Sequence, residues 1–153
     1  MDLRALYQEV IVDHNRSPRN FRRIEHPDKQ LEGFNPLCGD RLTVYLKTNG
    51  ETIDDVAFEG SGCAISVASA SLMTEALKGK PISEAERLFH QVHDLLTGQS
   101  DTAMEGKLAV LGGVKEYPSR IKCGLLGWHA LMHALNDEGA PTEEGVVTTK
   151  DGA

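Results

Sequence analysis

The sequence is short of the features that mark several large classes of protein. Aromatic residues make up only 5% of its 153 residues, and Lys and Arg number 16 against 23 Asp and Glu. The net charge of -7 argues against nucleic acid and anionic membranes as partners, because both select for clustered Lys and Arg. No apolar run approaches the roughly 18 residues that a membrane-spanning helix needs. The N-terminus lacks the charged-then-apolar order of a signal peptide, so we expect a cytoplasmic protein.

Cysteine is scarce as well, with only Cys38, Cys63 and Cys123. Three cysteines cannot all pair with one another, and a reducing compartment disfavours disulfides, so thiolate chemistry or metal ligation is the better expectation. The alternative is three inert cysteines in the core, since free cysteine is among the most buried residue types. The chain is long enough to bury a core without disulfides or a metal.

Hydrophobic periodicity predicts an α+β fold. Apolar residues at helical spacing predict helices around 3–14, 67–77, 84–96 and 121–135. Alternating apolar residues predict a hairpin of strands over 42–47 and 53–58, joined at Asn49-Gly50, with 61–65 as a third strand and 15–34 as loop. Ser83 to Glu86 resembles a capping box at the start of the third helix. We therefore expect a small three-stranded antiparallel sheet covered on one face by helices, with a metal site at one end.

The same patterns predict one domain over residues 1–136. The segment 137–153 is rich in Gly, Glu and Thr and has little to bury, so we expect it to be a disordered tail.

The surroundings of the cysteines indicate a metal site that the fold assembles. Cys38 and Asp40 are two residues apart in a segment about to become a strand, which puts both side chains on one face. Cys63 follows the predicted hairpin, and Cys123 begins the last helix, where the unpaired amides favour a thiolate. Successive cysteines are 25 and 60 residues apart, unlike the close pairs of a zinc finger. Our hypothesis is a single site made of Cys38, Asp40, Cys63 and Cys123.

The donor set leaves two metal groups open. Three thiolates and one carboxylate give zinc a four-coordinate shell. Its single oxygen ligand, the carboxylate, exchanges more easily than the three sulfur ligands. The same set can hold an iron–sulfur cluster, and the carboxylate would make that cluster easier to release. A purely structural zinc ion is a further alternative.

The histidines offer a weaker alternative, a hydrolytic metalloenzyme that binds its metal through His129 and His133. His129 and His133 are four residues apart on the last predicted helix, but Ala130 stands where a metalloprotease motif carries its glutamate. We expect these two, and His90 and His93 on the preceding helix, to lie on solvated faces. His14 is expected to be an ordinary surface or capping residue.

Three motifs in order resemble those of iron–sulfur cluster assembly proteins of the IscU, NifU and SufU type. They are Asn-Pro-Leu-Cys-Gly-Asp at 35–40, Gly-Ser-Gly-Cys-Ala-Ile-Ser at 60–66 and Arg-Ile-Lys-Cys at 120–123. The likeness covers residues 1 to about 136 and includes Asp13-His14 and Pro18-Arg19-Asn20.

Within that family the sequence resembles the SufU branch more than the IscU branch. Lys122 stands where IscU-type scaffolds carry a histidine that can itself bind metal, and residues 80–98 look like an extra segment of SufU-type proteins. The stretch 117–120 also lacks the Pro-Pro-Val-Lys motif through which IscU proteins engage their chaperone.

The resemblance implies a zinc-dependent sulfurtransferase. Such a protein accepts persulfide sulfur from a cysteine desulfurase of the SufS type and serves downstream iron–sulfur assembly proteins. By analogy the metal ligands are Cys38, Asp40, Cys63 and Cys123, and Cys38 is the leading candidate acceptor. Arg120 and Lys122 are assigned to positioning near the site or the partner. The alternative is a scaffold on which a 2Fe-2S cluster is assembled and transferred to apo-proteins.

Overall fold

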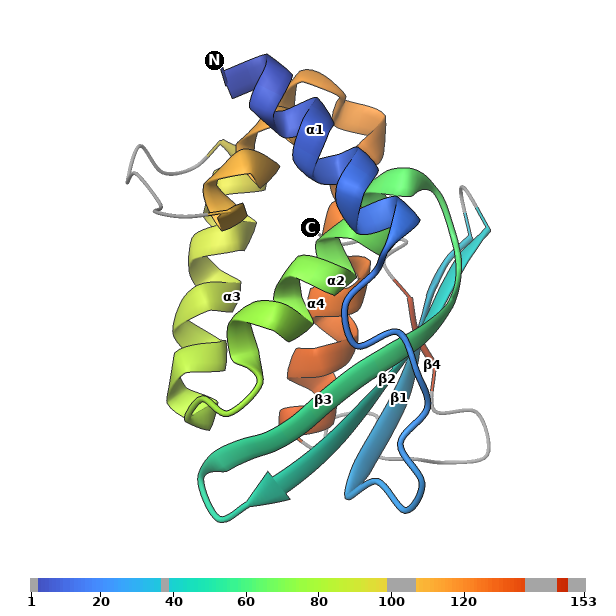
Figure 1. The fold of residues 1–153 in the computed structure, drawn as a ribbon, viewed down its shortest axis with the longest axis vertical. Coiled ribbons are helices and arrows are strands. Elements are labelled where there is room, and N and C mark those ends of the chain that lie inside the picture. Colours follow the sequence, from blue (N-terminus) through green and yellow to red (C-terminus); the bar gives the residue numbers. More distant parts are fainter. Residues whose placement is uncertain (1–2, 37–38, 99–106, 137–145, 149–153) are drawn as a thin grey trace.

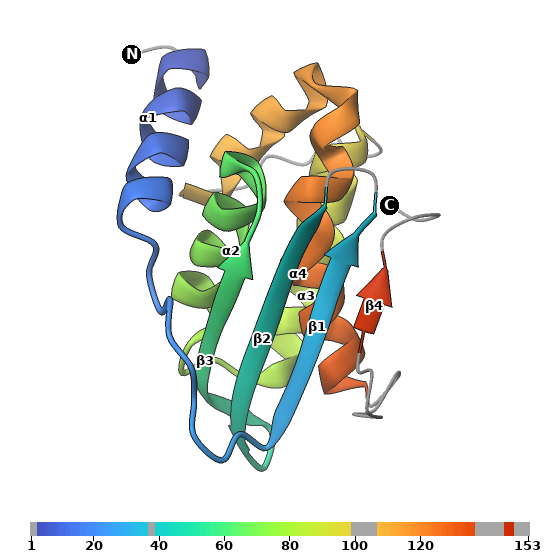
Figure 2. The same ribbon diagram turned by 90° about the vertical axis from the view of Figure 1, so that its right-hand side faces the viewer.

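The computed structural model describes residues 3–36, 39–98, 107–136 and 146–148. They form a sheet of four strands in the order β3-β2-β1-β4, with helices packed against one of its faces (Figures 1 and 2). Figure 2 shows this arrangement most directly, with the sheet in front of α2, α3 and α4. The α+β class predicted from the sequence is confirmed.

The central part of the sheet is a meander of three antiparallel strands. Strands β2 (Asp40–Asn49) and β3 (Thr52–Ser61) form the predicted hairpin, and β1 (Lys29–Asn35) pairs with the other edge of β2. Gly50 occupies the turn with a φ of 63°, a conformation that glycine adopts without strain. The short strand β4 (Val146–Thr148) lies parallel to β1.

The other regular elements of the described chain are four α-helices and two 3-10 helices. They are α1 (Leu3–Arg16), α2 (Ala64–Leu77), α3 (Ile82–Thr97), η1 (Lys107–Glu116), η2 (Pro118–Arg120) and α4 (Ile121–Leu135). Helices α2 and α4 lie directly on the sheet, while α1 packs on α2 and α3 packs on η1 and α4. None of these helices combines the length and apolarity needed to cross a membrane.

The core lies between the sheet and helices α2 and α4. Leu42, Val44 and Leu46 point from β2 into it and are fully buried, as is Trp128 of α4. Helix α4 can approach the strands closely because Gly33 of β1 leaves room for it: a Cβ there would lie 3.1 Å from a methyl carbon of Leu126. The size of this core explains why the fold needs no disulfide.

The predicted third strand was wrong. Residues 64 and 65 form the first turn of α2, and the third antiparallel strand is β1, inside the stretch predicted as loop. Its inward-facing positions are Leu31, Gly33 and Asn35, of which only one is a large apolar residue. Strand alternation is therefore invisible in the sequence of β1, because its neighbours require a glycine and a polar side chain there.

Two further expectations differ from the structure. Helix α3 begins at Ile82 with Pro81 as its N-cap, and no side-chain capping bond is found among the described residues. Ser83 therefore does not cap the helix. In the first turn, Glu84 forms an ion pair with Arg87. Within the segment expected to be a disordered tail, Val146–Thr148 forms β4 because the edge of β1 offers backbone hydrogen bonds. The other residues of that segment lie outside the described part of the chain.

Candidate metal centre

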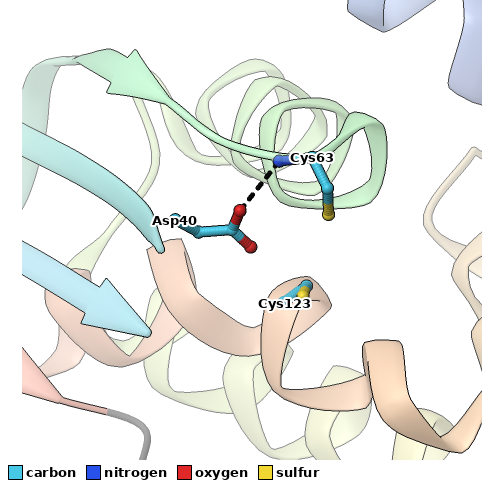
Figure 3. Close-up of side chains that lie close together, drawn as sticks. All are labelled: Asp40, Cys63 and Cys123. Carbon is cyan, nitrogen blue, oxygen red and sulfur yellow. Dashed lines mark hydrogen bonds between the residues drawn. The ribbon is translucent and has the colours of Figure 1, made fainter. Parts of the chain in front are cut away.

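Three of the predicted ligands meet at one end of the sheet. Asp40 is the first residue of β2, Cys63 is the N-cap of α2, and Cys123 lies in the first turn of α4. One ligand atom from each residue lies within 4.8 Å of the other two. Figure 3 shows the Asp40 carboxylate facing the gap between the two cysteines. In the described part of the chain this is the only such group of three His, Cys, Asp or Glu residues.

Two glycines bring Cys63 against Asp40. Gly60 has a φ of 138°, and a Cβ there would lie 2.2 Å from the carbonyl oxygen of Arg41 on the neighbouring strand. A Cβ on Gly62 would lie 3.1 Å from Oδ1 of Asp40. The chain therefore passes from β3 into α2 so close to β2 that a side chain would crowd the passage.

Asp40 is held as a carboxylate by donors from α2. It is 2% exposed, its Oδ1 accepts the backbone N–H of Cys63 at 2.9 Å, and its Oδ2 accepts the hydroxyl of Ser66 at 2.5 Å. Burial alone would raise the pKa of Asp40, but hydrogen bonds from Ser66, Cys123 and Cys63 outweigh it and hold the pKa below its ordinary value.

The thiol of Cys63 ionises readily. A hydrogen bond from Cys123 lowers the pKa of Cys63, burial raises it, and hydrogen bonds from Ser66 lower it further. Together these effects bring the pKa of Cys63 to about 5. Sγ of Cys63 lies 3.5 Å from Oγ of Ser66. Cys123 is fully buried, and its Sγ accepts a hydrogen bond from Nδ2 of Asn35 at 3.7 Å. At neutral pH the pair therefore carries a thiolate and its donor next to a carboxylate.

The other predicted site residues are Cys38, Arg120 and Lys122. Cys38 lies outside the described residues; near it, the backbone N–H of Gly39 donates to the carbonyl oxygen of Asn35 at 2.8 Å. Arg120 is exposed at the end of η2, and Lys122 is half-buried immediately before Cys123.

Two residues that support the cluster, Ser66 and Asn35, were not predicted from the sequence. Ser66 lies one helical turn after Cys63, and Asn35 ends β1. Both belong to motifs that the sequence analysis had singled out, so their position was a usable signal. Their roles as donors were not readable, because each donates to a residue more than 20 positions away.

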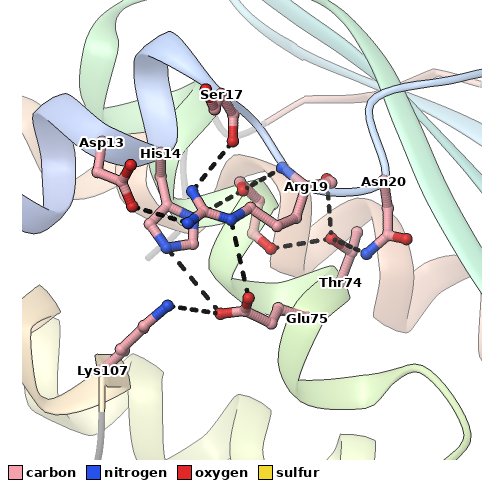
Figure 4. A network of polar contacts seen from close by, with 9 residues as sticks. Asp13, His14, Ser17, Arg19, Asn20, Thr74, Glu75 and Lys107 are labelled. Atoms are coloured by element: carbon pink, nitrogen blue, oxygen red, sulfur yellow. Dashed lines mark hydrogen bonds and ion pairs between the residues drawn. The ribbon is translucent and has the colours of Figure 1, made fainter.

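His14 is not the surface residue that was expected. It is fully buried, and its Nδ1 lies 2.7 Å from Oγ of Ser71 on α2. Figure 4 shows it in a polar network in which Arg19 contacts Asp13 at 2.7 Å and Glu75 at 3.8 Å. The network joins α1 and the following loop to α2, away from the ligand cluster.

Comparison with known proteins identifies relatives along nearly the whole chain. Residues 6–124 match the model of the NifU-like N-terminal domain. The zinc-dependent sulfurtransferase SufU of Bacillus subtilis (strain 168) is 40% identical over 146 residues, which cover 94% of this chain and 95% of that protein. The iron–sulfur cluster assembly scaffold protein IscU of Streptococcus pyogenes serotype M1 is 38% identical over 135 residues, covering 87% and 84%.

Solved structures agree with this relationship. The crystal structure of FiSufU from Fervidobacterium islandicum AW-1 is similar with a TM-score of 0.80 at 39% identity, covering 86% of this chain and 97% of that one. The N-terminal part of a NifU-like protein from Brucella abortus has a TM-score of 0.79 at 23% identity, covering 90% and 97%, and supports the fold alone.

Proposed function

The chain belongs to the NifU-like N-terminal domain family, and from this premise we propose that it is a zinc-dependent sulfurtransferase of iron–sulfur cluster assembly. It accepts persulfide sulfur from a cysteine desulfurase of the SufS type in the cytoplasm and passes it to downstream assembly proteins. The observation that carries the proposal is the convergence of Asp40, Cys63 and Cys123, in a chain 40% identical to a zinc-dependent sulfurtransferase.

The donor set suits zinc. Zinc prefers four ligands and binds both thiolate sulfur and carboxylate oxygen, which Cys38, Asp40, Cys63 and Cys123 together provide. The Asp40 carboxylate has about four lone-pair sites, so it can keep its hydrogen bonds from Cys63 and Ser66 and still bind a metal. Bound zinc would keep the thiolates deprotonated and, having no redox chemistry, would leave a persulfide intact.

Cys38 is the residue proposed to accept sulfur. Its thiolate attacks the terminal sulfur of the desulfurase persulfide, forming a new S–S bond while the S–S bond of the donor breaks. The desulfurase cysteine leaves as a thiolate, so the sulfur changes carrier without an external oxidant or reductant. Cys63 and Cys123 are the other two proposed thiolate ligands of the metal. The buried Asp40 carboxylate supplies an oxygen ligand that exchanges more easily than a thiolate.

Arg120 and Lys122 are proposed to act on the partner side of this reaction. Arg120 is exposed where the chain enters α4, and Lys122 is next in sequence to a proposed ligand. Two cations at this position favour the approach of an anionic persulfide or an acidic surface of the desulfurase.

The deciding experiment begins with the metal and sulfide content of protein purified anaerobically without added metal. We expect one zinc per chain, no acid-labile sulfide and a colourless solution. The zinc protein is then added to a cognate desulfurase, whose sulfide production should rise with wild-type protein and not with Cys38→Ala. A colourless zinc protein that fails to stimulate the desulfurase would overturn the proposal.

A second candidate is a scaffold for a 2Fe-2S cluster. It is favoured by the relatives named as scaffold proteins, among them the IscU of Streptococcus pyogenes. Iron and sulfide in near-equal amounts, visible thiolate-to-iron absorption and transfer to an apo-ferredoxin would establish this function instead. In that case Asp40 becomes the residue to test for cluster release.

A further inference from the structure

Four of the six histidines gather where α3 and α4 pack together. His90 and His93 lie on α3, while His129 and His133 lie one turn apart on α4. The prediction that His129 lies on a solvated face was wrong, because the residue is half-buried. Its Nε2 is shielded from solvent and has no hydrogen-bond partner among the described residues. A buried polar nitrogen in that condition is uncommon in folded proteins and asks for an explanation.

The rings of these residues form a compact group around Phe89. The ring centroid of Phe89 lies 5.4 Å from that of His129 and 6.0 Å from that of His93. The rings of His93 on α3 and His129 on α4 lie edge to face, with centroids 6.5 Å apart and planes at 82°. His133 is near enough to affect the charge state of His129, as is His93.

We propose that His93, His129 and His133 bind a first-row transition-metal cation, such as Ni²⁺ or Zn²⁺, between α3 and α4. Imidazole is a preferred ligand for these ions, and two histidines four residues apart on a helix present their rings to the same side. His129 lies six residues beyond Cys123, or about 9 Å along the helix, so this site is separate from the Asp40 cluster.

Two features of the cluster suit a ligand role. Nδ1 of His93 lies 3.6 Å from Oδ1 of Asp94, and a carboxylate beside one ring nitrogen commonly orients the other toward a metal. Burial, and then the nearby His93 and His133, lower the pKa of His129 to about 4, so its ring is neutral at pH 7 and able to coordinate.

The rings are near, but not at, coordination distance. A zinc–nitrogen bond of roughly 2.0–2.1 Å places two ligating imidazole centroids about 5 to 6 Å apart, slightly closer than the 6.5 Å between His93 and His129. Binding one ion therefore requires the rings of His93 and His129 to turn about their side-chain bonds and approach each other.

The test is a titration of the full-length protein, as purified, with Ni²⁺ by calorimetry. The metal already bound at the Asp40 cluster is counted before and after. We expect about one Ni²⁺ per chain to bind without loss of that metal. His93→Gln and His129→Gln should each weaken Ni²⁺ binding by at least about tenfold, the lower end of what even second-shell changes cost metal sites.

The matched control is His26→Asn, which changes an exposed histidine outside the cluster at a φ of 57° that asparagine tolerates. It should bind Ni²⁺ as tightly as wild type. Because His93 is partly exposed, His93→Gln is the variant expected to fold normally, and circular dichroism checks this. Absence of Ni²⁺ binding, binding only as the resident metal leaves, or equal affinity in the two variants and wild type would each overturn the proposal.

Discussion

At the scale of single residues, the centre depends on donors that hold its ligands in place. The hydroxyl of Ser66 donates to Asp40 at 2.5 Å and lies 3.5 Å from Sγ of Cys63, so it supports two proposed ligands. Ser66→Ala should therefore weaken zinc binding about 10- to 100-fold, the range seen when residues that orient metal ligands are removed. Competition with a chromophoric chelator measures the affinity.

Ser83→Ala is the matched control for this change. Ser83 is exposed on α3, away from the cluster, and its loss should leave zinc affinity unchanged. If Ser66→Ala also bound zinc with wild-type affinity, the hydrogen bond to Asp40 would have no role in holding the metal.

The ligand residues could be predicted from the sequence, whereas their supporting residues could not. Asp40, Cys63 and Cys123 each lie where an element begins, and their residue types carry metal chemistry by themselves. Serine and asparagine are common throughout any sequence, so Ser66 and Asn35 become recognisable only when the fold shows what they donate to.

At the scale of elements, the passage from β3 into α2 decides where Cys63 lies. Gly60 has a φ of 138° and faces the backbone of Arg41, so Gly60→Ala adds both strain and a clash. We expect it to lower the free energy of unfolding by about 3 kcal/mol or more, since strained backbone and overpacking each cost about 1 to 3 kcal/mol. Urea denaturation measures the change.

Gly50→Ala separates backbone strain from crowding. Gly50 has a φ of 63° with open space around it, so alanine there should cost only about 1 to 2 kcal/mol. Equal losses in the two variants would show that the contact with Arg41 does not restrict this passage.

The contact between α1 and α2 gives a prediction for pH. His14 is fully buried between them, and burial lowers the pKa of its ring below the ordinary value of 6.5. As the pH falls below about 6.5 the unfolded chain takes up a proton that the folded chain does not, so stability is lost. The free energy of unfolding of metal-free protein should therefore fall between pH 7 and pH 5, by at most about 1.4 kcal/mol per pH unit from this residue.

His14→Asn tests the assignment, because asparagine cannot titrate in this range. Its absolute stability will be lower, but its stability should depend less steeply on pH than that of wild type. His26→Asn, at an exposed position, should keep the wild-type dependence. If His14→Asn kept that dependence too, residues other than His14 would account for it.

Elements were predictable where the sequence carries strong periodicity. The hairpin and α4 alternate or repeat their apolar residues clearly, because each faces the core along its length. Strand β1 was not predictable, since Gly33 and Asn35 serve the approach of α4 and the metal centre and interrupt its apolar pattern.

At the scale of the whole molecule, the sheet and helices enclose a continuous core whose residues come from nearly every described element. Cys63 and Cys123 lie at one end of it and are not part of that packed cluster. The overall class was therefore readable from the sequence, since it depends on many apolar positions at once. The convergence of Asp40, Cys63 and Cys123 could only be hypothesised from the sequence. It depends on the relative positions and orientations of the three elements that carry these residues.

The same architecture predicts that metal removal loosens the protein without unfolding it. A core of this size supports the fold alone, so chelation should leave the far-ultraviolet circular dichroism largely unchanged. Zinc at a free concentration 100 times its Kd stabilises by about 2.7 kcal/mol, so its loss should lower Tm by roughly 5 to 11 °C. A scan of metal-loaded and chelated protein measures both. Complete loss of helical signal on chelation would instead make the ion structural, and sulfur acceptance would then need a thiolate that the metal does not occupy.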